Sequence, residues 1–157
     1  MENLSNEDSI LNLWTILYKC THFILKAREK ELRVLDITPE QASVLYILHV
    51  VGGRSTRSEI AKYTCREIAT ISGLIKNLEK KRLVRLEENR NDKRTKYVII
   101  TEDGATKYEA TAIRGSLHSI FDDLTTSERE ILETIVKKLY KKATAVLTDM
   151  YKPTYLR

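Results

Sequence analysis

The 157-residue sequence has few of the residues that build metal centres or disulfide scaffolds. It contains two cysteines, Cys20 and Cys65, and three histidines. No Cys-x-x-Cys or His-x-x-x-His spacing occurs among them, which argues against a zinc site, and two cysteines do not make a disulfide framework in a chain this long. We expect Cys20 to be an ordinary buried core residue, with a redox-sensing thiol as the alternative.

Long apolar runs and catalytic motifs are also missing. The longest apolar stretch, residues 44–51, is interrupted by His49 and is far too short to cross a bilayer. Residues 1–8 are polar and acidic, unlike a signal peptide, so we expect a cytoplasmic protein with no membrane partner. No glycine-rich phosphate loop or Gly-x-Ser-x-Gly motif is present, and the acidic pair Asp122–Asp123 suits helix capping. We therefore expect neither enzyme activity nor a cofactor.

Basic residues are concentrated in the middle of the chain. Residues 54–96 contain thirteen Lys/Arg against six Asp/Glu, a net charge of +7, whereas residues 1–53 carry −2 and residues 97–157 carry zero. A positive charge confined to one segment predicts that this segment binds a polyanion. A solvated charged face without any partner is the alternative.

Capping signals and apolar spacing predict three helices in the first part of the chain. A long helix over about residues 9–35 has apolar residues on more than one face, which indicates more than one neighbour. Thr38-Pro39-Glu40-Gln41 is typical of a helix start, and that helix must end at Gly52-Gly53. Thr56-Arg57-Ser58-Glu59 is a second capping box and opens a short helix.

An amphipathic helix and a hairpin follow in the basic segment. The helix is predicted over about residues 67–81, with the apolar stripe Ile71, Leu74, Ile75 and Leu78 and an opposite face that lacks carboxylates. Residues 83–87 and 96–100 have strand composition and are joined by a charged loop, which predicts a β-hairpin. Helix, short helix, amphipathic helix and basic hairpin, in this order, predict a winged helix-turn-helix.

The last third of the chain is predicted to be helical. Thr101 can cap a helix that runs to about Phe121, and a box at Thr125 or Thr126 opens a final helix of five turns. Long terminal helices have little core of their own to cover, so we expect them to pack together and against a second copy of the chain. The expected class is mostly α with a small β-hairpin wing, divided into a dimerisation helix (1–37), a DNA-binding lobe (38–104) and C-terminal dimerisation helices (105–157).

A series of short motifs lies between Thr38 and Gly104: Thr38–Gln41, Ser58–Ala61, Ile71–Lys81, Leu83-Val84, Asp92–Arg94 and Ile100–Gly104. Their order and spacing resemble the MarR (multiple antibiotic resistance regulator) family of winged-helix repressors. The resemblance implies a homodimer that binds a pseudo-palindromic, double-stranded operator with half-sites about one helical turn apart. It also implies repression of transcription, relieved by a small phenolic or other amphipathic effector.

The helix over residues 67–81 is expected to enter the major groove through its N-terminal half. Its candidate DNA contacts are Ala69, Thr70, Ser72, Gly73, Lys76 and Asn77. Thr and Ala methyl groups suit thymine methyls, Asn77 suits adenine or phosphate, and Lys76 suits phosphate. Ile68-Ala69 replaces the more polar helix start common in the family, which argues against hydrogen bonds to bases from these two positions. The candidate contacts to backbone phosphates are Ser55, Thr56, Arg57 and Arg66.

The hairpin loop is the expected wing, with candidate residues Arg90, Asp92, Lys93, Arg94 and Lys96. By resemblance, Arg94 inserts into the minor groove, where a narrow A·T-rich stretch attracts a guanidinium group. Phosphates repel a carboxylate, so Asp92 is expected to orient Arg94 or the loop backbone.

The effector pocket is expected where the terminal helices meet the DNA-binding lobe. The candidate lining residues are Trp14, Tyr18, His22, Tyr46 and His49, with plain core or interface packing as the alternative. A winged-helix module that binds another protein is a second alternative for the whole chain. Such a module would not need four basic residues in its wing, and salt-dependent duplex binding separates the two possibilities.

Overall fold

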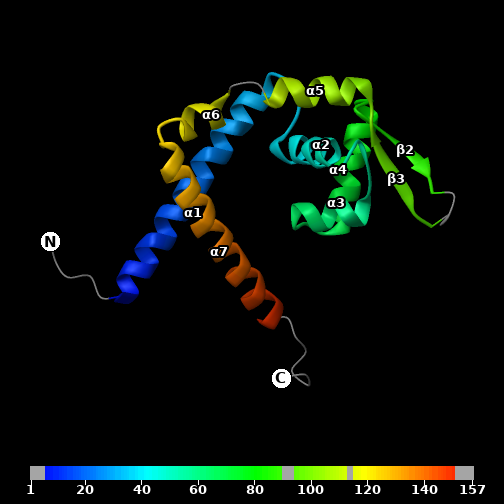
Figure 1. Cartoon of the computed structure of the whole chain (residues 1–157). Coiled ribbons are helices and arrows are strands. Elements are labelled where there is room, and N and C mark those ends of the chain that lie inside the picture. The colour runs from blue at the N-terminus through cyan, green and yellow to red at the C-terminus, as the bar shows by residue number, and fades with distance from the viewer. Residues whose placement is uncertain (1–5, 90–93, 113–114, 151–157) are drawn as a thin grey trace. The chain divides into compact units, whose positions relative to one another are not determined.

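The structure is a computed structural model of the chain, and it describes residues 6–89, 94–112 and 115–150 (Figure 1). The chain divides into two compact units, residues 1–117 and residues 118–157. The elements are α1 (Asn6–Arg33), α2 (Pro39–Val50), β1 (Arg54–Thr56), α3 (Arg57–Thr64), α4 (Ile68–Lys80), β2 (Val84–Glu88), β3 (Lys96–Ile100), α5 (Glu102–Ala112), α6 (Ser116–Phe121) and α7 (Thr126–Met150). The predicted fold class is confirmed: mostly helical, with a small antiparallel sheet.

The predicted helix boundaries around α2 are confirmed in detail. Thr38 Oγ1 accepts a hydrogen bond from the backbone N of Gln41 (3.2 Å), and Gln41 Oε1 accepts one from the backbone N of Thr38 (3.3 Å). Pro39 takes the first helical position, where no amide is needed. The helix ends before Gly52 and Gly53, which adopt φ values of +83° and +87° that few other residues tolerate.

The sheet has the strand order β1-β3-β2, and all neighbours are antiparallel. The predicted hairpin is confirmed as β2 and β3, with Leu86 opposite Val98. The third strand, β1, was not predicted. It has only three residues, and it pairs with the edge of β3 opposite to β2, with Ser55 facing Val98. Its strand conformation therefore depends on a partner more than forty residues away in the chain.

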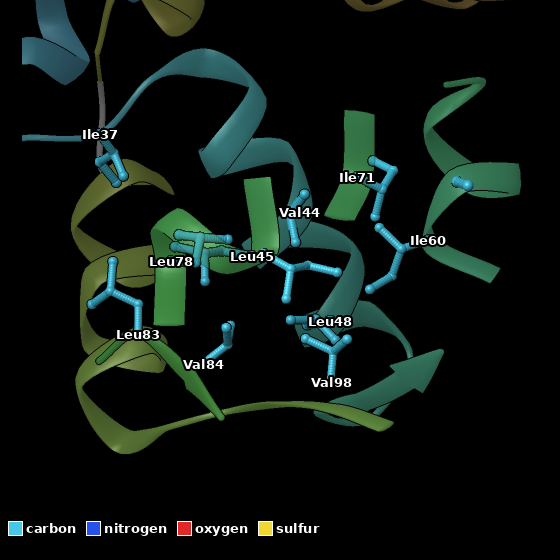
Figure 2. Close-up of a cluster of buried hydrophobic side chains, with 12 residues drawn as sticks. Ile37, Val44, Leu45, Leu48, Ile60, Ile71, Leu78, Leu83, Val84 and Val98 are labelled. Atoms are coloured by element: carbon cyan, nitrogen blue, oxygen red, sulfur yellow. The ribbon is translucent and has the colours of Figure 1, made fainter. Parts of the chain in front are cut away.

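The core of the first unit lies between α2, α3, α4 and the sheet (Figure 2). Ile71, Ile75 and Leu78 are completely buried and Leu74 packs beside them, so the predicted stripe on α4 is confirmed. Complete burial of one such aliphatic side chain contributes about 1.5–3 kcal/mol. The stripe therefore fixes which face of α4 remains exposed.

The helix predicted from Thr101 to about Phe121 is wrong, because it is interrupted after Ala112. Glu31 of α1 is the reason: it accepts hydrogen bonds from Ser116 Oγ (2.6 Å) and Ser116 N (3.2 Å) and from Arg28 (2.9 Å). A Cβ at Gly115 would lie 1.5 Å from Glu31 Oε1, so any other residue there would force the Glu31 side chain to move. Burial would raise the pKa of Glu31, but the hydrogen bonds from Ser116 and Arg28 hold that pKa below its ordinary value.

The expectation that Cys20 is buried is also wrong for the single chain. Cys20 and Cys65 are both exposed. Cys20 lies on the part of α1 whose side chains are exposed from Asp8 to Phe23, so the general tendency of cysteine to be buried did not predict its position here. Among the described residues, no helix has the length and apolar character that crossing a membrane requires.

Candidate nucleic-acid interface

Helix α4 combines a buried apolar face with an exposed face of small and polar residues. Ala69, Thr70, Gly73, Lys76 and Asn77 are all exposed. Ser72 is half-buried, and its hydroxyl donates a hydrogen bond to the carbonyl of Ile68 (2.8 Å). A Cβ added at Gly73 would meet nothing within 4 Å, so the chain itself does not require glycine there. The surface beside Gly73 is open to close approach from outside.

The turn between α3 and α4 sets the direction of this helix. Cys65 ends α3 in the left-handed conformation (φ +53°), and its backbone N bonds back to the carbonyls of Ala61 and Lys62. Glu67 then occupies the N-cap of α4 without a side-chain capping bond. The first amides of α4 therefore lack the side-chain acceptor that caps α2 and α3, and such amides attract anions.

The structure does not support Ser55 as a phosphate contact. Ser55 is buried, and its hydroxyl donates to Glu59 Oε2 (2.9 Å). Thr56 is engaged with the same carboxylate, because its backbone N (2.8 Å) and Oγ1 (3.0 Å) both donate to it. This network closes the predicted capping box of α3, which is confirmed.

Arg57 and Arg66, the other predicted phosphate contacts, lie in different surroundings. Arg57 is half-buried, and its Nε is shielded from solvent with no hydrogen-bond acceptor among the described residues. Arg66 is exposed and lies 3.7 Å from Glu40. Phosphate binding by Arg66 therefore has to compete with a surface ion pair, which is weak in water.

Only part of the predicted wing can be located. Lys96 is exposed at the start of β3 and Arg94 is exposed two residues before it, whereas Arg90, Asp92 and Lys93 lie outside the described residues. In the same sheet, the Arg54 guanidinium lies 3.7 Å from the centre of the Tyr97 ring and 3.7 Å from Glu87. Sequence reasoning missed this contact, because it joins three strands that are paired only in the folded chain.

The base of the hairpin is tied to α5. Thr101 Oγ1 donates to the carbonyl of Arg82 (2.7 Å) and accepts from the backbone N of Gly104 (3.0 Å), which confirms Thr101 as a cap. The Thr101 amide donates to the Leu83 carbonyl (3.1 Å). The first turn of α5 is thus hydrogen-bonded directly to the segment that leads into β2.

Residues 35–95 match the MarR family. Over this segment, the chain is similar to the MarR family. The HTH-type transcriptional regulator Hpr of Exiguobacterium sibiricum is 31% identical over 103 residues, which are 66% of this chain and 52% of the relative. The chain therefore spans about half the length of that curated relative.

Solved structures show the same fold at low sequence identity. A mutant MarR from E. coli complexed with operator DNA has a TM-score of 0.76 and 24% identity, over 87% of this chain and 99% of that one. The organohalide-sensing regulator RdhR in its 2,4-dichlorophenol-bound form has a TM-score of 0.77 and 20% identity, over 90% and 87%. The curated relative Hpr is named as a transcriptional regulator.

The MarR-family resemblance also predicted an effector pocket, and its five candidate residues do not form one cluster. Trp14 and Tyr18 are both more than 60% exposed on α1, with ring centres 6.1 Å apart. Tyr46 and His49 of α2 lie instead beside Tyr108 of α5, and the His49 and Tyr108 rings stack at 4.4 Å. Tyr108 was missed by the sequence analysis.

His22, the fifth candidate, lines a groove of about 490 Å³. The other walls come from α1, the turn after it, the start of α2 and Lys81 at the end of α4. Lys81 also pairs with Asp36 in that turn (3.0 Å). The groove therefore touches the C-terminal end of the helix that carries the candidate DNA contacts.

The capping network of α3 gives a test of this MarR-family lobe. Glu59→Gln keeps an acceptor but removes the charge, so we expect a loss of about 1 kcal/mol at pH 7, small because the side chain is exposed. The backbone amide of Thr56, then the hydroxyls of Ser55 and Thr56, hold the pKa of Glu59 below its ordinary 4.5. A carboxylate whose pKa is lowered by folding stabilises the fold at pH values above its ordinary pKa. This stabilisation is lost as the pH falls through the pKa of the folded state. Urea unfolding should therefore show a larger difference at pH 7 than at pH 3; a constant difference contradicts this role of the charge.

Proposed function

We propose that this chain is a cytoplasmic transcription regulator that binds double-stranded DNA as a homodimer, with α4 in the major groove and the β2–β3 wing in the minor groove. The observation that carries the proposal is the exposed face of α4. From Ile68 to Asn77 the helix has no carboxylate, and after Ile68 its exposed residues are small, polar or cationic. Such a surface can approach base edges without repelling the phosphates that flank them.

The charge around α4 supports the same partner. Lys76, Arg94 and Lys96 are exposed on the two elements proposed to contact DNA, within the segment of net charge +7. Neutralising phosphates with such side chains releases counterions and supplies much of the binding free energy at low salt. A module that binds another protein would not need this concentration of cations, so we favour the duplex.

The terminal helices support a dimer. Exposed apolar surface of this extent on two long helices is unfavourable in water, so we expect a partner to bury it. The exposed apolar residues are Ile10, Leu11, Leu13, Trp14, Ile16, Leu17, Tyr18, Phe23 and Leu25 on α1 and Ile131, Leu132, Ile135, Val136, Leu139, Tyr140, Val146 and Leu147 on α7. We propose that a second copy covers them, because two-fold symmetry would present two α4 helices to a pseudo-palindromic site. Residues 1–37 and 105–157 would then form the dimerisation region, and residues 38–104 the DNA-binding lobe.

We further propose that DNA binding represses transcription and that a small aromatic effector relieves it. The structurally similar RdhR was solved with 2,4-dichlorophenol bound. In this chain the groove beside His22 reaches Lys81 at the end of α4, so a ligand there would contact the same helix that contacts DNA. The stack of His49 on Tyr108 is the second candidate place, because it joins α2 to α5.

Salt dependence tests the proposal. A duplex selected from a random pool should bind with a log–log salt slope of about −5 to −9, as expected for six to ten neutralised phosphates per dimer. Lys76→Gln should make the slope shallower by about 2, one unit for each subunit. Lys142→Gln on α7 is the matched control and should keep the wild-type slope. A slope near zero, or a chain that sediments as a stable monomer, would contradict the proposed function.

A further inference from the structure

Helix α4 starts with an exposed aliphatic residue. Ile68 is the first residue of the helix, and 53% of it is exposed. It is outside the buried core, unlike Ile71 and Ile75 on the same helix. A β-branched residue also gains nothing here from helix propensity. Neither the core nor the helix therefore accounts for an isoleucine at this position.

Ile68 lies on the side of α4 that is proposed to face DNA. Residues spaced by four lie along one side of a helix, so Ile68, Ser72 and Lys76 form one row. Lys76 is exposed at the far end of that row. Gly73 stands beside the row, and nothing in the chain fills the space next to it. A partner that approaches Lys76 and Gly73 closely also meets Ile68.

The chemistry of this first turn is apolar. Ile68 and Ala69 offer only methyl and methylene groups, and the Ser72 hydroxyl already donates its proton to the Ile68 carbonyl. In the major groove, the base edge that presents an apolar group is that of thymine, through its 5-methyl group. A helix start without side-chain hydrogen-bond donors at its first two positions therefore matches thymine better than guanine or adenine.

We propose that Ile68 is a specificity-determining residue that selects thymine in each half-site through contact with the 5-methyl group. This inference rests on the proposed function, because it requires α4 to lie in the major groove. Ile68 would recognise the base by an apolar contact, whereas more polar recognition helices use hydrogen bonds.

The test compares thymine with uracil, which lacks only the methyl group. The duplex selected from a random pool is prepared in two forms. One form contains thymine, and in the other deoxyuridine replaces every thymine. Wild-type protein should bind the uracil duplex about 15-fold more weakly than the thymine duplex. The loss of one buried methyl group weakens binding about fourfold, and the two half-sites multiply this factor. Ile68→Ala should bind the two duplexes within about twofold of each other. Val34→Ala is the matched control, since it shortens a residue that is 88% exposed in the turn after α1, and it should keep the wild-type difference.

The outcomes separate this inference from the proposed function. Equal binding of the two duplexes by wild-type protein overturns the selection of thymine. A difference that persists in Ile68→Ala overturns the role of Ile68 and assigns the methyl contact to another residue. Failure of the wild-type protein to bind any duplex at low salt overturns the proposed function instead.

Discussion

Replacing Arg94 with alanine should lower the affinity for the selected duplex about 100-fold or more. Arg94 is exposed two residues before β3, and a dimer would place one guanidinium in the minor groove at each side of the site. A charge-assisted hydrogen bond contributes about 1.5–3 kcal/mol, so the loss of two should exceed the loss of any single phosphate contact. Fluorescence anisotropy at fixed salt measures the affinity.

Two companion variants sharpen this result. Arg94→Lys should recover only part of the affinity, because lysine keeps the charge but lacks the planar donors of arginine. Arg33→Ala removes an arginine that is 77% exposed on α1 and should bind as the wild type does. Unfolding temperature and sedimentation should stay the same in all three variants. Unchanged binding by Arg94→Ala would remove the wing from the proposed mechanism.

The parts of the fold that depend on nearby residues could be predicted from the sequence. The capping boxes at Thr38 and Thr56 join residues three apart, and the stripe on α4 needs only one turn of spacing, so both were found. The interruption after Ala112 was missed because Gly115 meets Glu31, which is 84 positions earlier in the chain.

The same distinction applies to the candidate site. The exposed face of α4 follows from its buried face, so exposure of Thr70, Gly73 and Asn77 could be expected. The burial of Ser55 depends on strand β1 and on the carboxylate of Glu59, and neither is visible in local composition. The five aromatic candidates are separated because α1 and α2 place them beside different neighbours, and residue type alone does not report that.

Replacing Gly104 with alanine should destabilise the lobe by about 3 kcal/mol or more. A Cβ at this position would lie 2.0 Å from the carbonyl oxygen of Leu83 and 2.9 Å from the side chain of Ile100. A backbone carbonyl cannot turn away as a side chain can, so the first turn of α5 has to move, and overpacking of this kind typically costs 1–3 kcal/mol or more. Urea unfolding measures the loss, and a wild-type midpoint would show that α5 is not held this closely to the base of the wing.

Gly73→Ala is the matched control for this prediction and also tests the candidate interface. Its Cβ would meet nothing in the chain, and alanine is the better helix former, so we expect a gain of about 0.5–1 kcal/mol in unfolding free energy. The new methyl group would stand on the exposed face of α4, where the proposed duplex approaches. Stability and DNA affinity should therefore change in opposite directions in this variant: the chain becomes harder to unfold and binds the selected duplex more weakly. Wild-type affinity with raised stability would show that DNA does not approach α4 closely at Gly73.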